Sequence, residues 1–163
     1  MFPKQRLIDL EKSLELRYET VSEARKRLAI TDEIFAKTAI KQRLREEVLP
    51  ELRREEVEYW ELLRQVSYEC DIQETDAQDA IVKVVTQIDN SVEETSPEQM
   101  VRLLREIRDK LKEPGNAASA KAKLALSLIP GVLAYEIELD TENTLRKAFQ
   151  PLKNLFQEAI EKK

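Results

Sequence analysis

The stretch PELRREEVEYWELLRQV, residues 50–66, decides the fold class of this 163-residue chain. Its apolar side chains recur every three or four positions between charged ones, which is typical of an amphipathic helix. They are Leu52, Val57, Tyr59, Trp60, Leu63 and Val66. Pro50 lacks an amide hydrogen, so the helix either kinks there or restarts with Pro50 in its first turn, and we favour a kink. This pattern predicts one long helical element over residues 32–69, with Trp60 buried in the core.

A second amphipathic helix is predicted on the N-terminal side of this stretch, over residues 4–29. Its apolar residues follow a heptad pattern; they are Leu7, Leu10, Leu14, Val21, Ala24 and Leu28. Thr31 or Asp32 offers an N-cap oxygen for the element that follows. Two antiparallel helices therefore begin the chain. The glutamates at 55, 56 and 58 alternate with arginines at helical spacing, so we expect them on a solvated, ion-paired face.

The next part of the chain is acidic. Residues 71–95 hold seven acidic side chains against Lys83, a net charge of −6. Thr75 or Asp76 is expected to cap a short helix here. The sequence Ser96-Pro97-Glu98 then predicts the start of another helix, which Pro114-Gly115 ends.

Residues 117–139 are open to two interpretations. Tyr135, Ile137 and Leu139 alternate with glutamates, and Pro130-Gly131 precedes them, which favours a β-hairpin over residues 123–139. The alanine, lysine and leucine content of residues 117–129 instead favours a helix that ends at Pro130-Gly131. We prefer the hairpin. Its apolar side chains need a covering layer, so they are candidate self-association residues: Leu124, Leu126, Leu128, Tyr135, Ile137 and Leu139.

The last helix carries basic and aromatic residues together. Asp140 or Thr141 is expected to cap it, and it kinks or restarts at Pro151. From residue 143 onward the net charge is +3. Candidate contacts with an anionic membrane surface are therefore Lys147, Phe149, Leu152, Lys153 and Phe156. The alternative is that this face packs into the bundle. Because residues 71–95 are acidic, we also expect the basic tail to rest near them as a latch.

The composition predicts one mainly α domain over residues 1–163, a bundle of five or six helices with the hairpin, because 36% of residues are charged and only two are glycine. The absence of histidine and the single Cys70 remove the usual general base and zinc ligands. Residues 71–82 lack the glycine and the final carboxylate of a calcium loop. We expect no enzyme activity, catalytic residue, cofactor or metal, and the net charge of −5 argues against nucleic acid.

Two segments carry a resemblance to a known family: AKAKLALSLIP, residues 120–130, and YEIELDTE, residues 135–142. With the Trp60 region, REIRDKL at 105–111 and Pro114-Gly115, the chain resembles N-terminal helical effector or adaptor domains of bacterial signalling proteins. In those proteins such domains precede NACHT or STAND ATPase, caspase-like or TIR modules. In architecture the chain is also similar to helical bundles of the HeLo or MLKL type.

The resemblance implies a non-enzymatic effector or adaptor in bacterial immunity or regulated cell death. It would act by self-association with protein partners or fused effector and ATPase modules, and by membrane engagement. The alternative is a purely structural helical scaffold, or an interaction module without membrane activity. Mixed charge follows Met1 and residues 124–135 are too short to span a bilayer, so we expect a cytoplasmic protein that contacts membrane peripherally on activation.

Overall fold

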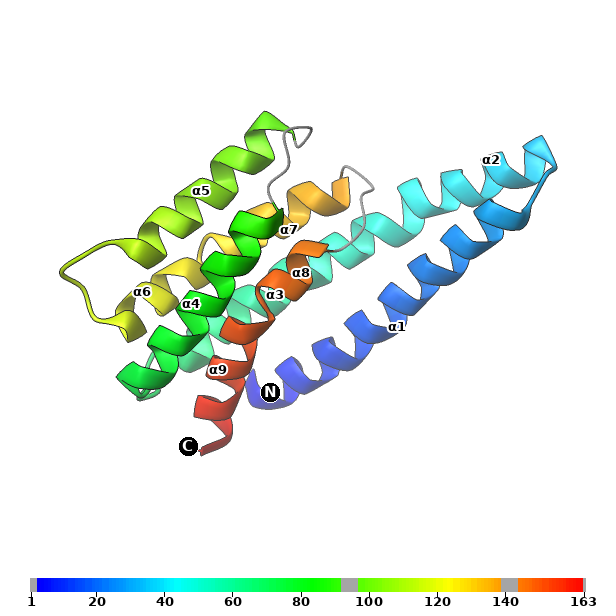
Figure 1. Ribbon diagram of the computed structural model, residues 1–163. Helices are drawn as coiled ribbons and strands as arrows, with labels where there is room; N and C mark the ends of the chain where they lie inside the picture. The colour runs from blue at the N-terminus through cyan, green and yellow to red at the C-terminus, as the bar shows by residue number, and fades with distance from the viewer. Residues whose placement is uncertain (1–2, 92–96, 139–143, 163) are drawn as a thin grey trace.

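The computed structural model describes residues 3–91, 97–138 and 144–162, and the elements they form are all helical (Figure 1). The expected mainly α fold is confirmed. The helices are α1 (Pro3–Ile30), α2 (Ile34–Arg43), the π-helical η1 (Leu44–Val48), α3 (Leu49–Ser67), α4 (Glu74–Ser91), α5 (Glu98–Lys112), α6 (Ala118–Leu126), α7 (Ile129–Glu138), α8 (Thr144–Ala148) and α9 (Gln150–Lys162).

The long element predicted around Pro50 is present as the continuous succession α2, η1 and α3. The wider π turn ends just before Pro50, where the amide of Leu49 donates to the carbonyl of Leu44, five residues earlier. Proline cannot donate to the preceding turn, and a π turn is one way for a helix to pass such an interruption. The chain therefore runs through Pro50 without leaving the helical conformation, antiparallel to α1 (Figure 1).

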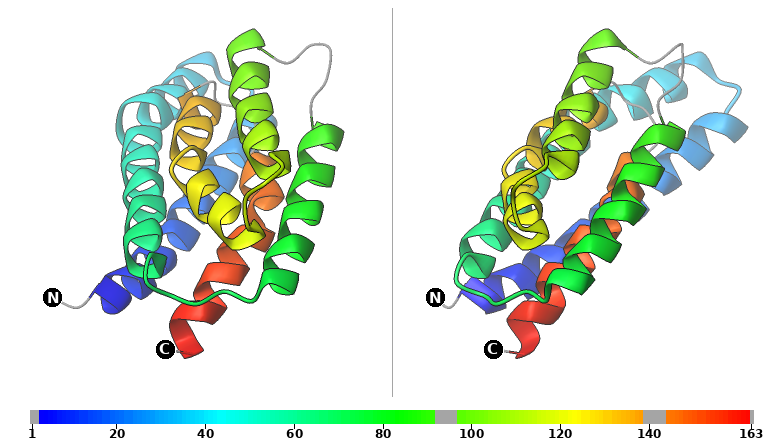
Figure 2. Two further views of the ribbon diagram at one scale, coloured as in Figure 1. Left: turned by 90° about the vertical axis from the view of Figure 1, so that its left-hand side faces the viewer. Right: turned by 60° about the vertical axis from the view of Figure 1, so that its left-hand side comes forward.

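Helix α3 contacts helices from both halves of the chain. It packs against α1, α6, α7 and α9, and α4 covers the C-terminal helices and contacts α5 and α6 (Figure 2). The largest side chains of the core are fully buried: Trp60, Tyr59, Phe149 and Phe156. The predicted burial of Trp60 is confirmed, with 1% of its surface exposed.

The predicted β-hairpin at residues 123–139 is wrong, because α6 and α7 occupy this part of the chain. Ile129, Val132, Leu133 and Glu136 follow helical spacing, and all four are buried. In the sequence, the alternation of Tyr135 and Ile137 with glutamates obscures this helical pattern. The helical pattern is the one that defines the buried face of α7. Pro130 lies in the first turn of α7, where its missing amide hydrogen costs no helical hydrogen bond.

Contacts with distant residues hold α6 in place. The carboxylate of Glu74, at the start of α4, accepts hydrogen bonds from the first two amides of α6, Ala118 at 2.6 Å and Ser119 at 3.4 Å. In return, the ammonium group of Lys123 donates to the carbonyls of Tyr68 and Cys70 beyond the end of α3. The N-terminus of α6 thus receives a negative charge and the C-terminal end of α3 a positive one, as the helix dipoles favour. These contacts connect α6 to both α3 and α4.

The described chain is divided into more helices than the five or six we expected. Two of the additional elements replace the hairpin, and the last predicted helix is split into α8 and α9. The restart predicted at Pro151 is confirmed, since α9 begins at Gln150. Within the described ranges, none of the helices combines the length and the hydrophobicity needed to cross a bilayer.

Candidate functional site: buried ion pairs beneath the C-terminal helices

Glu56 is the centre of a buried polar network under α8. Its side chain is fully buried, and it accepts hydrogen bonds from the Tyr18 hydroxyl at 2.8 Å and the Trp60 indole nitrogen at 2.9 Å. The Nε atom of Arg146 lies 3.3 Å from both carboxylate oxygens. A carboxylate in the core is costly unless such partners surround it. Helices α1, α3 and α8 are therefore joined at one residue.

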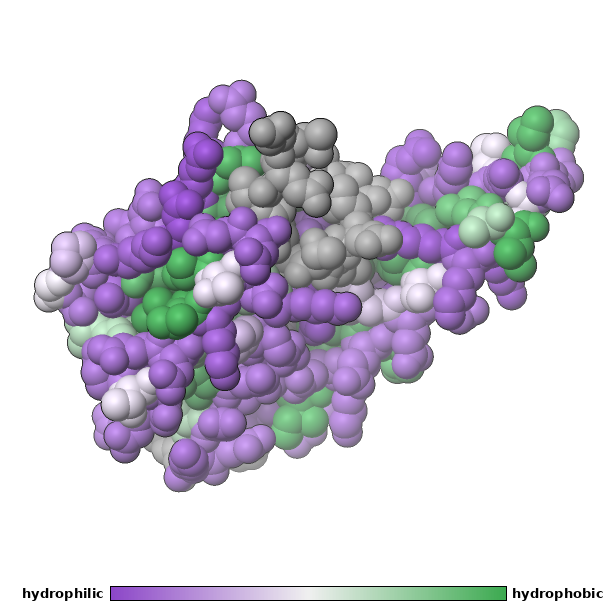
Figure 3. All heavy atoms as spheres, viewed as in Figure 1, coloured by the Kyte–Doolittle hydropathy of each residue, from purple (hydrophilic) through white to green (hydrophobic). Residues whose placement is uncertain are grey.

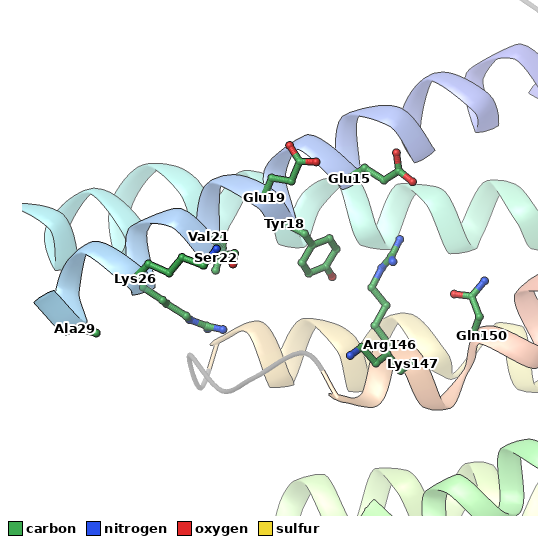
Figure 4. Close-up of a pocket in the computed structure, with 11 residues that line it drawn as sticks. Glu15, Tyr18, Glu19, Val21, Ser22, Lys26, Ala29, Arg146, Lys147 and Gln150 are labelled. Atoms are coloured by element: carbon green, nitrogen blue, oxygen red, sulfur yellow. The ribbon is translucent and has the colours of Figure 1, made fainter.

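Arg146 also contacts an aromatic ring. Its guanidinium carbon lies 4.7 Å from the centre of the Tyr18 ring, a cation–π contact. Burial, together with the Glu56 carboxylate, raises the pKa of the Tyr18 hydroxyl, so the hydroxyl stays protonated and acts as a donor. Figure 4 shows Tyr18 and Arg146 extended toward each other from α1 and α8, at an open cavity of about 930 Å³ between these helices.

A second ion pair anchors α9. The ammonium group of Lys153 lies 2.9 Å from Glu11 of α1, and the lysine side chain is buried. Gln157, one turn further on, donates to both oxygens of Glu11 and to the Tyr59 hydroxyl, at 2.8–3.1 Å. Lys153 also lies 5.3 Å from the centre of the Tyr59 ring. Each of the two C-terminal helices thus carries one cation, partly buried at Arg146 and buried at Lys153, that is paired with a glutamate from the N-terminal half.

The two polar groups around Lys153 have shifted pKa values. Burial and the nearby Glu11 carboxylate raise the pKa of the Tyr59 hydroxyl. For Glu11, burial acts to raise the pKa, but hydrogen bonds from Lys153 and Gln157 and the lysine charge outweigh it and lower the pKa. The folded protein therefore favours the ionised form of Glu11.

The shift at Glu11 predicts part of the acid sensitivity of the fold. Because the folded-state pKa lies below the ordinary value of 4.5, the contribution to stability is complete above that pH. It is lost as pH falls through the folded-state pKa. In Glu11→Gln, the free energy of unfolding should therefore fall less steeply on acidification below pH 4.5 than in the wild type. Urea denaturation at a series of pH values measures this, with Glu61→Gln as the control for loss of one surface charge. Parallel curves for the wild type and Glu11→Gln would contradict the prediction.

The candidate membrane residues of the C-terminal segment, residues 144–162, lie mostly inside the bundle. Phe149, Leu152 and Phe156 are fully buried and Lys153 is 5% exposed, whereas Lys147 is exposed. The expected position of the basic tail beside the acidic segment is present, since α8 and α9 pack against α4. Arg146 and Lys153, however, pair with glutamates of α3 and α1.

The candidate self-association residues are dispersed. Of the four whose side chains are described, Leu126 is buried, Leu128 and Tyr135 pack partly buried against the core, and only Leu124 is exposed. Leu139 and the side chain of Ile137 lie outside the described residues. The described residues therefore form no continuous exposed surface.

We expected three glutamates of α3, at 55, 56 and 58, on a solvated face, and this prediction is wrong for two of them. Glu58 is partly exposed and pairs with Arg6, as expected for a solvated face. Glu55 and Glu56 are instead buried. Glu56 lies four residues before Trp60 and after Leu52, on the helix face that is otherwise apolar. That spacing is the signal that identifies it as an interior residue.

Within the described ranges, no group of three histidine, cysteine, aspartate or glutamate residues is arranged to hold a metal ion. Comparisons of the chain with protein-family models, with curated proteins and with solved structures found no match.

Proposed function

We propose that this chain is a non-enzymatic effector or adaptor module whose C-terminal segment is displaceable. In the resting protein, α8 and α9 are held by the ion pairs of Arg146 and Lys153. In the active protein, their apolar face is free to contact a second copy of the chain or a membrane. This is the class of function that the sequence resemblance implies.

The observation that supports the proposal is the ion pair beneath α8 between the fully buried Glu56 and the partly buried Arg146. A buried ion pair adds little net stability compared with apolar side chains of the same volume, because both charges lose their hydration. A buried ion pair does, however, require its two charged side chains to lie at one particular distance and orientation. A segment held in this way docks in a single position, and it loses that position when either partner is removed.

Displacement of the segment would uncover a large apolar surface. Phe149, between α8 and α9, is buried together with Leu152 and Phe156 of α9. The buried face of α4, which packs against these helices, carries Ala77, Val84 and Ile88. Surfaces of this kind do not stay exposed to water and drive association. The membrane residues predicted from the sequence then act only in the displaced state.

The competing function is a structural scaffold in which α9 is a permanent part of the core. Native-state hydrogen exchange distinguishes the two. We expect the amides of α9 to exchange through a partial opening whose free energy is lower than that of the α3 amides. The opening should become easier in Arg146→Met, with α3 still protected. Equal opening free energies for α9 and α3 in both proteins would support the scaffold and overturn the proposal.

A further inference from the structure

The N-terminal helices extend beyond the bundle as an arm, which we define as residues 22–43. The buried residues of α1 end at Val21, and none of the ten residues of α2, all of which are described, is buried. Figure 1 shows α2 and the end of α1 projecting away from the other helices, at the end of the molecule opposite to the two termini. The arm is held together by partly buried side chains between its helices, Ala24, Leu28 and Ile40.

The end of the arm carries large apolar side chains in water. Ile30, Ile34 and Phe35, which we call the arm tip, are 80%, 73% and 82% exposed. Among the large hydrophobic residues that the structure describes, only Tyr68, at 74%, is exposed to a similar extent. Figure 3 shows hydrophobic atoms gathered at this end, with hydrophilic surface behind them. Single exposed apolar residues are ordinary, but three at the end of one projection mark a contact surface.

The charge of the arm is opposite to that of the whole chain. The arm, residues 22–43, holds six basic side chains and three acidic ones, a net charge of +3 in a chain of net charge −5. The helical spacing places Lys41 and Arg45 on the same face of the rod as Ile34, and Lys26 and Arg27 on the same face of α1 as Ile30. Basic side chains therefore lie behind the tip on both helices.

Two of the three acidic residues of the arm, Asp32 and Glu33, lie in the turn itself. The carboxylate of Glu33 is engaged as the N-cap of α2, where it accepts hydrogen bonds from the amides of Phe35 at 2.9 Å and Ala36 at 2.6 Å. This cap orders the turn and fixes the start of α2, so Ile34 and Phe35 project from a rigid end. Asp32 is exposed and opposes contact with an anionic surface, as does Glu23, which lies 3.5 Å from Lys26 on α1.

We propose that the arm tip binds the interface of an anionic membrane in the folded, resting protein. Apolar side chains with basic residues on the adjoining faces are the features of interfacial membrane binding. Ile30, Ile34 and Phe35 enter the headgroup region, while the lysines and arginines behind them stay level with lipid phosphates. The site is independent of the proposed function, because it needs no displacement of α8 or α9.

Charge favours a lipid surface over a second copy of this chain as the occupant. Two arms that meet tip to tip would bring two groups of net charge +3 together, whereas an anionic bilayer is complementary to each of them. The apolar residues are also confined to the narrow end of the arm. A small apolar end can insert into a deformable lipid interface, but it is a poor match for a flat protein–protein contact.

Co-sedimentation of the full chain with vesicles tests the proposal. We expect binding to vesicles with about one third phosphatidylserine and little binding to pure phosphatidylcholine. Raising the salt from about 0.1 M to about 1 M should weaken binding, because the screening length falls to about 3 Å. Ile34→Ser with Phe35→Ser should weaken it about tenfold or more. Lys41→Glu with Arg45→Glu should do the same.

Matched controls separate the site from general effects. Tyr68, at the far end of α3, is 74% exposed, so Tyr68→Ser removes an equally exposed aromatic side chain away from the arm. Arg105→Glu with Lys112→Glu makes the same charge change on exposed positions of α5. Both controls should bind as the wild type does, and all variants should keep the helical circular dichroism.

Three outcomes would overturn the proposal: equal sedimentation with both vesicle types, no sedimentation with either, or unchanged binding of the tip variant. If the tip variant instead dissociates a dimer in analytical ultracentrifugation while the wild type ignores vesicles, the occupant is a second copy and the membrane assignment is wrong. Hydrogen exchange of α9 tests the proposed function separately, so either idea can fail without the other.

Discussion

Replacing Glu56 by glutamine should lower the free energy of unfolding by about 3–5 kcal/mol, among the largest effects of any single substitution in this chain. The change leaves the side-chain volume intact, so it makes no cavity. It removes the negative charge that faces Arg146, and it replaces an oxygen that accepts from Tyr18 or Trp60 with a donor. The cost is that of a cation left without its partner at the edge of the core.

Urea denaturation followed by circular dichroism measures this effect, and Glu58→Gln is the matched control. Glu58 lies two residues further along the same helix and pairs with Arg6, but both side chains are more than one third exposed. Its loss should cost no more than about 1 kcal/mol. Adding Arg146→Met to Glu56→Gln should recover part of the lost stability. If the two glutamate variants were equally stable, Glu56 would have no special place in the fold.

The second large effect is expected for Trp60→Ala, which should cost about 3–5 kcal/mol. The indole ring is 1% exposed, and it packs edge to face against Tyr59 with the ring centres 6.0 Å apart. The substitution leaves a cavity in the middle of α3 and removes one of the hydrogen bonds to Glu56.

Trp60→Phe divides this effect into its parts. It keeps most of the buried surface and removes the indole N–H, so the hydrogen bond to the carboxylate accounts for about 1.5–3 kcal/mol of the difference from the wild type. Tyr68→Ala, at a residue that is 74% exposed, should change stability by less than about 0.5 kcal/mol. A Trp60→Ala protein as stable as that control would show that the centre of α3 repacks without loss.

Periodicity in the sequence was sufficient to predict the mainly helical fold and much of the core. The apolar positions of residues 4–29 and 50–66 recur with the helical period, and Leu10, Leu14, Leu52 and Trp60 are buried as that period requires. Pro50 and Pro151 also marked the places where helices change. These features are local, because the helical repeat brings side chains three and four positions apart to one face whatever the rest of the chain does.

The structure of residues 117–139 was decided by tertiary contacts. Local pattern allowed a hairpin or a helix. The helix α6 is completed by Glu74, whose carboxylate caps it from 44 positions away, and α7 by the burial of Ile129, Val132 and Leu133. A contact between residues so far apart in the chain cannot be recognised from the sequence around either of them.

The same limit applies to the buried network. A glutamate on α3 and an arginine on α8, 90 positions apart in the chain, look like two surface charges until the fold brings them together. Burial then changes the energy of the pair, because Glu56 has lost its water in the core and depends on Arg146 and its other partners. The composition and spacing of the chain therefore determined which segments are helical. The pairing of those helices, and the identity of the charges that became interior, came only from the tertiary structure.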